Sequence, residues 1–296
     1  MNSWYEASAR QRVEALADPG SFEEFIGPEE RETSPHLALF DLPEQFDDGI
    51  VVGRARLDGR QVLVAAQEGR FMGGAFGEVH GAKLTGLLRA ARALRRPVLI
   101  LFDTGGVRLQ EANAGEMAIA EIMREVVTTR AQDIPVVGLI GGRAGCFGGG
   151  GLIAGCCSTL VISEQGRLSV TGPEVIETNR GAEEFDSKDR ALVWRVTGGK
   201  HRYLIGAVDV FVDDSTDAFR QAAIEALSGR SGLDILTLAA EQERLEHRLK
   251  RFGKMTEARD IWAALGMLYP DTVPSLGTEA FQTEGCHKRE NAHDAR

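Results

Sequence analysis

Residues 136–154 read VVGLIGGRAGCFGGGGLIA, an apolar run, then a glycine-rich loop, then a second apolar segment. The first five residues are typical of a buried parallel strand. The glycines at 148–151 let backbone N–H groups approach a ligand with no Cβ in the way. At the start of a helix, such N–H groups also attract negative charge. This stretch therefore predicts a strand–loop–helix unit whose loop binds an oxyanion.

A second glycine-rich loop lies upstream and reads Phe71-Met72-Gly73-Gly74-Ala75-Phe76-Gly77. Residues 61–66 before it have the composition of a strand, and residues 79–95 after it have the spacing of an amphipathic helix. Two such loops in one domain favour an enzyme that stabilises oxyanions with its backbone. The alternative interpretation is that the glycines only allow helices to pack closely.

Strands and helices alternate along most of the chain. Strands are predicted at 50–57, 61–66, 98–102, 136–140, 159–162 and 209–212, and helices at 4–18, 79–95, 109–131, 189–206, 216–228 and 234–251. Asp58-Gly59 predicts a hairpin turn. The alternation indicates an α/β fold with right-handed crossovers and a largely parallel sheet.

We expect three regions. These are an N-terminal helix and connection (1–48), an α/β domain (49–275) and a disordered tail (276–296), which is polar and mixed.

The composition limits the classes of function. The 296 residues are 43% hydrophobic, as in a globular protein with a substantial core, and carry a formal net charge of −10. An acidic chain argues against general binding of nucleic acid or of anionic membranes. The N-terminus lacks the layout of a signal peptide and no apolar run is long enough to span a bilayer, which predicts a cytoplasmic protein.

The cysteines offer no metal site. They stand at 146, 156, 157 and 286 and form no C-x-x-C pair, so neither a zinc ribbon nor another metal cluster is expected. Cys156 and Cys157 are predicted to be small core residues, since a disulfide between neighbours would be strained.

Four motifs carry a family resemblance. They are FMGG at 71–74, TGGVRLQEA at 104–112, GPEVIE at 172–177, and an N-terminal ARQRVEAL at 9–16 followed by DPGSF at 18–22. The series resembles the carboxyltransferase family of acyl-CoA carboxylases, which has the crotonase-like fold. The resemblance covers about residues 8–215 and implies a crotonase-like α/β domain with ββα repeats and helical additions at both ends.

Three further passages resemble the β subunits of biotin-independent malonate decarboxylases. They are QEGRFMGGAFGEVHGAK at 67–83, GGRAGCF at 141–147 and EEFDSKDRALVWR at 183–195. The resemblance implies pairing with a homologous γ subunit. The pair would decarboxylate malonyl thioester to acetyl thioester and CO2, with the substrate on the CoA-derived, phosphopantetheine-type arm of an acyl-carrier protein. No bound cofactor is implied.

Such a reaction passes through an enolate, which backbone donors stabilise. We assign Gly148, Gly149 and Gly150 to one oxyanion hole and place Gly73 and Gly74 on the other side of the thioester. Weaker candidates for contact with the thioester arm or its surroundings are Gly105, Gly106, Arg108, His80 and Glu78.

Each polar candidate has a structural alternative. Glu78 or His80 could protonate the enolate, or both could start a helix and face solvent. Gln110 and Glu111 could satisfy helix-end donors, and Arg108 is expected to form an ion pair rather than hold a carboxylate. His201 and Arg202 could contact a partner or a phosphate, or belong to a solvated helix start.

Two other functions stay open. One is a biotin-dependent carboxyltransferase subunit, which shares the fold and the loops. The other is a non-catalytic subunit that docks the carrier protein, for which the charged helix predicted at 234–251 offers a partner-facing surface.

Overall fold

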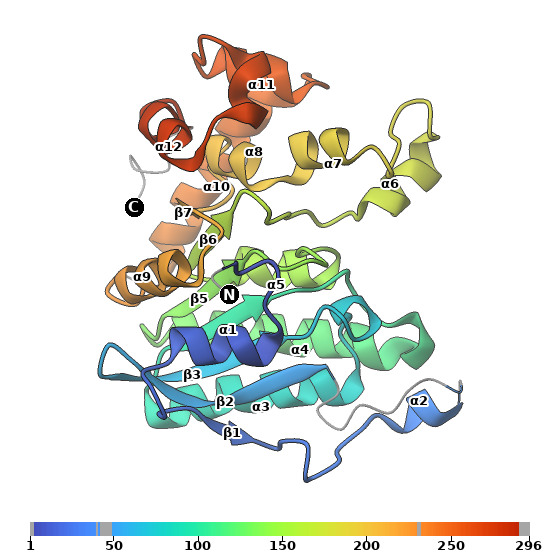
Figure 1. Ribbon diagram of the computed structural model, residues 1–296, viewed down its shortest axis with the longest axis vertical. Helices are drawn as coiled ribbons and strands as arrows, with labels where there is room; N and C mark the ends of the chain where they lie inside the picture. The colour runs from blue at the N-terminus through green and yellow to red at the C-terminus, as the bar shows by residue number, and fades with distance from the viewer. Residues whose placement is uncertain (1–2, 40, 42–48, 230–231, 290–296) are drawn as a thin grey trace.

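A seven-stranded sheet forms the centre of the molecule in the computed structural model, which describes residues 3–39, 41, 49–229 and 232–289 (Figure 1). Along the sheet the strands follow chain order: β1 (Glu23–Phe25), β2 (Ile50–Leu57), β3 (Arg60–Gln67), β4 (Val98–Phe102), β5 (Val136–Ile140), β6 (Thr159–Ser163) and β7 (Val210–Val212). From β3 onward all neighbours are parallel, so the loops after these strands gather at one edge of the sheet.

The first three strands are antiparallel. Asp58 and Gly59 join β2 to β3 as predicted, and both have the positive φ that a tight hairpin of this kind requires, 50° and 74°. Strand β1 was not predicted. It pairs with β2 through Glu23↔Arg54 to Phe25↔Val52, so the expected N-terminal connection over 1–48 contributes an edge strand.

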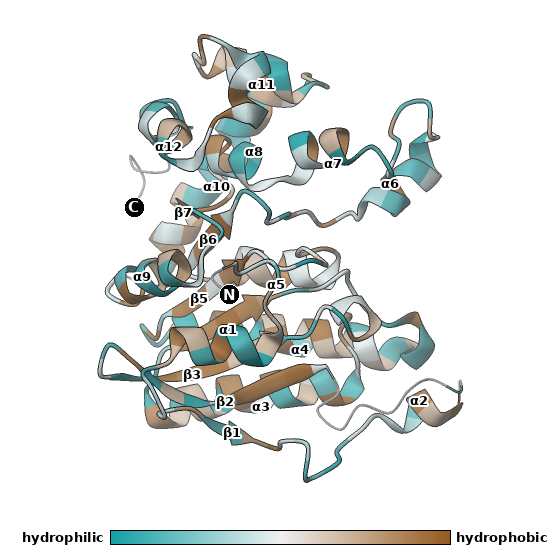
Figure 2. Cartoon of the chain, in the orientation of Figure 1, coloured by the Kyte–Doolittle hydropathy of each residue, from teal (hydrophilic) through white to brown (hydrophobic). Residues whose placement is uncertain are grey.

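Each face of the sheet is covered by its own core. One face packs against α3 (Glu78–Leu94), α4 (Asn113–Arg130) and α5 (Gly149–Cys156) through residues such as Leu84, Ile122 and Ile153. The other face packs against α1 (Ala9–Leu16) and α9 (Thr216–Ala226) through Trp4, Val13 and Phe219. The strands between these layers are strongly hydrophobic along their length (Figure 2).

Several helices differ from their predicted bounds. Helix α1 begins at Ala9 because Ser8 and Gln11 form a capping box. Helix α4 begins at Asn113 rather than 109, because a 3-10 turn (η2, Leu109–Glu111) and a positive φ at Ala112 precede it. The helix predicted at 189–206 is broken at Gly198 into α7 (Arg190–Thr197) and α8 (Gly199–Leu204).

The remaining elements lie in the loops and toward the C-terminus. They are a 3-10 turn η1 (Met72–Gly74), α2 (Pro35–Leu39), α6 (Pro173–Arg180), α10 (Ile235–Phe252), α11 (Ala258–Ala264) and a 3-10 turn η3 (Pro270–Ser275). Helix α10 matches its prediction and is largely exposed. Cys157 is buried and Cys156 partly buried, as expected of core cysteines.

The expectation of a disordered tail over 276–296 is wrong for its first part. Residues Thr278–Cys286 form helix α12, and Phe281 is fully buried on it. Its ring stands edge-on to Phe211, with the centroids 4.7 Å apart. One aromatic side chain therefore anchors a segment whose composition is otherwise polar. Residues 290–296 lie outside the described residues.

Within the described ranges, none of the helices is both long and apolar enough to cross a bilayer. The same ranges contain no group of three or more His, Cys, Asp or Glu side chains that could hold a metal ion.

Candidate active site

The glycine-rich loops meet at the carboxyl edge of the sheet, where hydrogen bonds between their backbones join them. The Gly105 N–H donates to the Gly73 carbonyl at 2.8 Å, which links the loop after β4 to the loop after β3. The Thr104 N–H donates to Gly145 at 2.8 Å, and the Cys146 N–H to Arg167 at 2.8 Å, which extends the linkage to the loops after β5 and β6. The four loops therefore form one connected backbone surface.

Two glycines are required by close approach between these loops. A Cβ on Gly74, whose φ is +67°, would overlap the carbonyl oxygen of Asp103. A Cβ on Gly148 would lie 3.1 Å from the Cα of Gly106. The glycine-rich composition is therefore partly a packing requirement, which was the alternative to a binding role.

Most backbone donors in the loops already have acceptors. The Gly148 N–H donates to Val170 at 3.0 Å, the Gly150 N–H to Phe147 at 3.0 Å, and the Gly74 N–H to Phe71 at 2.9 Å. By contrast, the N–H groups of Gly73 and Gly149 donate to no acceptor in the part of the chain that the structure describes. The predicted set of five glycines thus contains two unused donors.

The direction of Gly149 differs from what its place in the loop implied. A Cβ there would lie 2.5 Å from Cδ1 of Ile119, on α4. A side chain at position 149 would therefore point into the contact between α4 and α5. It would disturb the core rather than extend toward a substrate.

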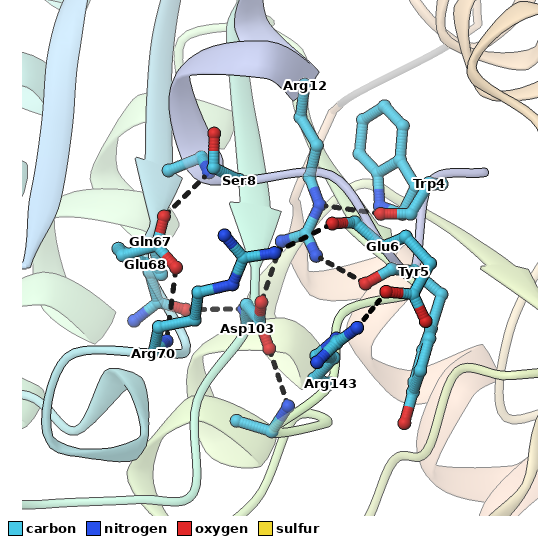
Figure 3. A network of polar contacts seen from close by, with 12 residues as sticks. Trp4, Tyr5, Glu6, Ser8, Arg12, Gln67, Glu68, Arg70, Asp103 and Arg143 are labelled. Atoms are coloured by element: carbon cyan, nitrogen blue, oxygen red, sulfur yellow. Dashed lines mark hydrogen bonds and ion pairs between the residues drawn. The ribbon is translucent and has the colours of Figure 1, made fainter. Parts of the chain in front are cut away.

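A buried ion pair supports the loops from beneath. Arg12 on α1 donates from Nη1 to Oδ2 of Asp103 at 2.8 Å, and the two side chains are only 1% and 4% exposed (Figure 3). The other carboxylate oxygen of Asp103 accepts the Ala144 N–H at 2.7 Å, and Gln67 accepts the Asp103 N–H at 3.2 Å. Asp103 thus holds α1, the end of β3 and the loop after β5 in one arrangement.

The chain is similar to known proteins over most of its length. The family model for the carboxyl transferase domain matches residues 6–228. The chain is 38% identical over 300 residues to malonyl-S-ACP:biotin-protein carboxyltransferase MADC of Malonomonas rubra, covering 94% of both proteins. It is 32% identical over 200 residues to the propionyl-CoA carboxylase beta chain of Saccharopolyspora erythraea, covering 67% of this chain and 36% of that protein.

A solved structure extends the likeness to three dimensions. A chain in the Pseudomonas malonate decarboxylase hetero-tetramer superposes with a TM-score of 0.79 at 41% identity, over 86% of this chain and 92% of that one. This chain belongs to the carboxyl transferase family. The crotonase-like fold expected from the four motifs is confirmed, because the structural relatives are carboxyltransferases of that fold.

In this carboxyl transferase chain, Arg108 forms a buried ion pair. It is 1% exposed and pairs with Glu111 at 3.1 Å, so the predicted ion pair is confirmed. Glu111 also accepts the N–H of Glu78, which starts α3. Glu111 therefore satisfies a helix-end donor, as the structural interpretation expected, but on α3 rather than on α4, the helix that follows it.

The two proton-donor candidates differ in their exposure to solvent. The His80 side chain is fully buried against Phe76 and contacts the Gln67 side chain at 3.2 Å, so the expectation that it faces solvent is wrong. Glu78 starts α3, is about half exposed and pairs with His36 at 3.0 Å, so the structural alternative of a solvent-facing helix start is correct for Glu78.

His201 and Arg202 do not form a solvated helix start. His201 is 7% exposed, and its Nδ1 accepts a hydrogen bond from Nε1 of Trp262 at 3.2 Å. Burial, together with the charges of Arg202 and Arg248, lowers the pKa of His201 from 6.5 to about 3. The imidazole is therefore neutral at physiological pH and forms part of the core under α11.

The Arg12–Asp103 pair predicts a large stability effect. In Asp103→Asn the guanidinium of Arg12 stays buried without a counter-charge, so we expect a loss of about 3–5 kcal/mol in the free energy of unfolding. Urea denaturation measures it. The control Glu23→Gln removes a pair with Arg54 that is more than half exposed, and it is expected to cost about 1 kcal/mol or less. Equal losses in the two variants would contradict the supporting role of Asp103.

His201 predicts a pH dependence. Its pKa is about 3 in the folded chain and 6.5 when exposed, so unfolding takes up a proton below pH 6.5. The free energy of unfolding should fall by about 1.4 kcal/mol per pH unit below 6.5, or about 2 kcal/mol at pH 5. In His201→Asn this contribution to the pH dependence of the free energy of unfolding should vanish. Denaturation at several pH values from 7 to 5 measures it. His287→Asn, where the ring is exposed before and after unfolding, is the control. An unchanged slope in His201→Asn would refute the assignment.

Proposed function

We propose that this chain is the β subunit of a malonate decarboxylase, a carbon–carbon lyase formed with a homologous γ subunit. The enzyme converts malonyl thioester, carried on the phosphopantetheine-type arm of an acyl-carrier protein, to acetyl thioester and CO2. The observation that carries the proposal is the likeness over 86% of the chain to a Pseudomonas malonate decarboxylase subunit. A second Pseudomonas structure of the enzyme, a hetero-dimer, matches with a TM-score of 0.67 and supports a partner subunit.

In the proposed reaction, the bond between the α-carbon and the carboxylate breaks and its electron pair moves into the thioester. CO2 leaves, and the negative charge of the enolate falls on the thioester oxygen. The N–H of Gly149, at the start of α5, donates to that oxygen, because it has no acceptor among the described residues. The α-carbon then takes a proton from water.

The other predicted glycines support this arrangement. Gly148 and Gly150 fix the backbone path around Gly149 through bonds to Val170 and Phe147. Gly73, which is exposed and has an unused N–H, bounds the thioester on the other side, with Gly74 beneath it. Gly105 and Gly106 hold the Gly73 loop in place, since the Gly105 N–H donates to Gly73 and the Phe76 N–H donates to Gly106.

Three of the weaker candidates have no place in the chemistry we propose. Arg108 is engaged with Glu111, His80 is enclosed between Phe76 and Gln67, and Glu78 points to His36. Water is therefore the proposed proton source.

We place the reaction in the cytoplasm, a reducing compartment, because all four cysteines are free thiols.

A second candidate is a biotin-dependent carboxyltransferase subunit. It is favoured by the 38% identity to MADC, whose name describes transfer between malonyl-S-ACP and a biotin protein. In that reaction the carboxyl group passes to biotin on a carrier protein. Both reactions use the same enolate, so the same loops serve either.

The fate of the carboxyl group separates the candidates. We expect this chain, purified with its partner subunit and given malonyl thioester on the carrier protein, to release CO2 at the same rate with and without avidin. The measurement is ¹⁴CO2 release from labelled malonyl thioester.

Loss of release with avidin would move the assignment to the biotin-dependent reaction. An absence of release by the assembled complex, while single substitutions in the glycine loops leave assembly intact, would favour a non-catalytic subunit that docks the carrier.

The Gly149 donor can be removed by proline, which is tolerated at the first position of a helix. Because Ile119 occupies the space beside Gly149, both variants are made in an Ile119→Ala background. We expect Gly149→Pro to lower kcat about 10²–10³-fold relative to Gly149→Ala, which adds the same Cβ but keeps the N–H. Circular dichroism checks that both fold. Equal kcat values for the two double variants would remove Gly149 from the oxyanion hole.

A further inference from the structure

A cavity of about 500 Å³ lies between α5, α8 and α10, away from the unused donors of the glycine loops. Its lining includes Gly151 and Gly155 of α5, Val170 of the loop after β6, and three arginines, Arg202, Arg244 and Arg248. The carboxylates of Asp209 and Glu241 also line it, so the cations outnumber the anions.

Arg202 is the distinctive group in this cavity. Its Nε is buried and lacks a hydrogen-bond partner, and no hydrogen bond or ion pair joins its guanidinium to any residue within the described ranges. Burial and the positive charge of Arg248 lower the pKa of Arg202 to about 10. Arg202 as a whole is partly buried, and a cation that is partly withdrawn from water without a counter-charge favours an anion from outside the chain.

The neighbouring groups are already arranged by the protein. Arg244 donates to Glu241 at 2.8 Å and to the Gly206 carbonyl at 3.2 Å, and Arg248 donates to the Ile205 carbonyl at 3.1 Å. Asp209 accepts the Leu160 N–H at 2.8 Å. These bonds fix the wall of the cavity, while the Arg202 guanidinium keeps its donors for a ligand. Its planar fork matches the oxygens of a phosphate.

The part of the lining that α5 supplies starts close to Gly149 along the chain, at Gly151, although Gly149 itself does not line the cavity. The Gly148 N–H donates to Val170, which lines the cavity, and Gly151 stands two residues after Gly149. The lining ends along α5 at Cys157, about 12 Å from Gly149 at the rise of an α-helix. At Gly155 nothing lies within 4 Å of where a Cβ would be. A ligand that reaches from Gly149 into the cavity would therefore run along α5.

We propose that the Arg202 cavity binds the phosphate of the arm that carries the thioester, and so positions the thioester at Gly149. The inference rests on the proposed function, because that function supplies a thioester arm with a phosphate. It assigns a role to Arg202, one of the two residues of the 198–203 segment for which the sequence left phosphate contact open.

The test compares two ligands that differ in the phosphate alone, acetyl-4′-phosphopantetheine and acetyl-pantetheine. Calorimetry gives the Kd of each for the complex of this chain with its partner subunit. We expect the phosphorylated thioester to bind at least about 10-fold more tightly, since hydrogen bonds to charged groups are strong. In Arg202→Met the ratio should fall to near one, with the Kd for acetyl-pantetheine unchanged.

Two further measurements check the variants. Lys250→Met removes a cation from the exposed surface of α10, outside the cavity, and should keep the 10-fold ratio. Without ligand, Arg202→Met should melt at a higher temperature than the wild type, because it removes an unpaired, partly buried charge. This readout also shows directly that the variant folds.

Three results would overturn the proposal. The first is an unchanged Kd ratio in Arg202→Met. The second is that inorganic phosphate raises the melting temperature of the wild type but not of Arg202→Met, while the ratio of the two Kd values is the same in both proteins. That result would assign the cavity to free phosphate. The third is that Arg202→Met loses the partner subunit on gel filtration while the Kd ratio is unchanged. That result would assign the cavity to an acidic side chain of the partner. Because binding is measured without turnover, a complex that releases no CO2 but shows the expected ratio would refute the proposed function and keep the phosphate site.

Discussion

The buried pair of Arg12 and Asp103 is the constraint on which the loop surface depends. Desolvation of two charges is costly, and the cost is offset here because the carboxylate of Asp103 accepts a backbone N–H and Arg12 also donates to the carbonyl of Trp4 at 2.9 Å. In return, the ends of β3, β4 and β5 are held to helix α1. The backbone of Asp103 in turn approaches Gly74 closely, so the ion pair also helps to position the glycine loop after β3.

The chemistry proposed for this surface uses the backbone rather than side chains. Polar side chains near the loops, such as Arg108 and Glu111, pair with each other, and Glu111 also accepts a hydrogen bond from the start of α3. What remains for a substrate are N–H groups whose direction is fixed by neighbouring hydrogen bonds. Donors that are already oriented need no reorganisation as charge develops, which is the condition for strong transition-state stabilisation.

The sequence predicted those parts of the structure that depend on local pattern. Strands β4 and β5 are continuous apolar runs, and the hairpin at Asp58-Gly59 has a backbone that few other residue pairs adopt. Parts that depend on distant contacts could not be predicted.

Helix α12 is held by the contact between Phe281 and Phe211, and β1 is held by its pairing with β2. In both cases the partners are distant in the sequence, and no local pattern indicates that they pair. Likewise, the sequence cannot distinguish Gly149 from Gly148 and Gly150, because the distinction lies in whether Val170 and Phe147 accept their N–H groups.

The Arg12–Asp103 pair also has a consequence for folding during synthesis. Arg12 emerges from the ribosome 91 residues before Asp103, which corresponds to about 5–20 s of translation at typical rates. Throughout that time its guanidinium lacks its counter-charge, and the helix that carries it has only the antiparallel strands β2 and β3 to pack on. Arg12 therefore gains its counter-charge only after Asp103 has been made, and the loop surface is completed only when the loop after β6, with Arg167, has followed.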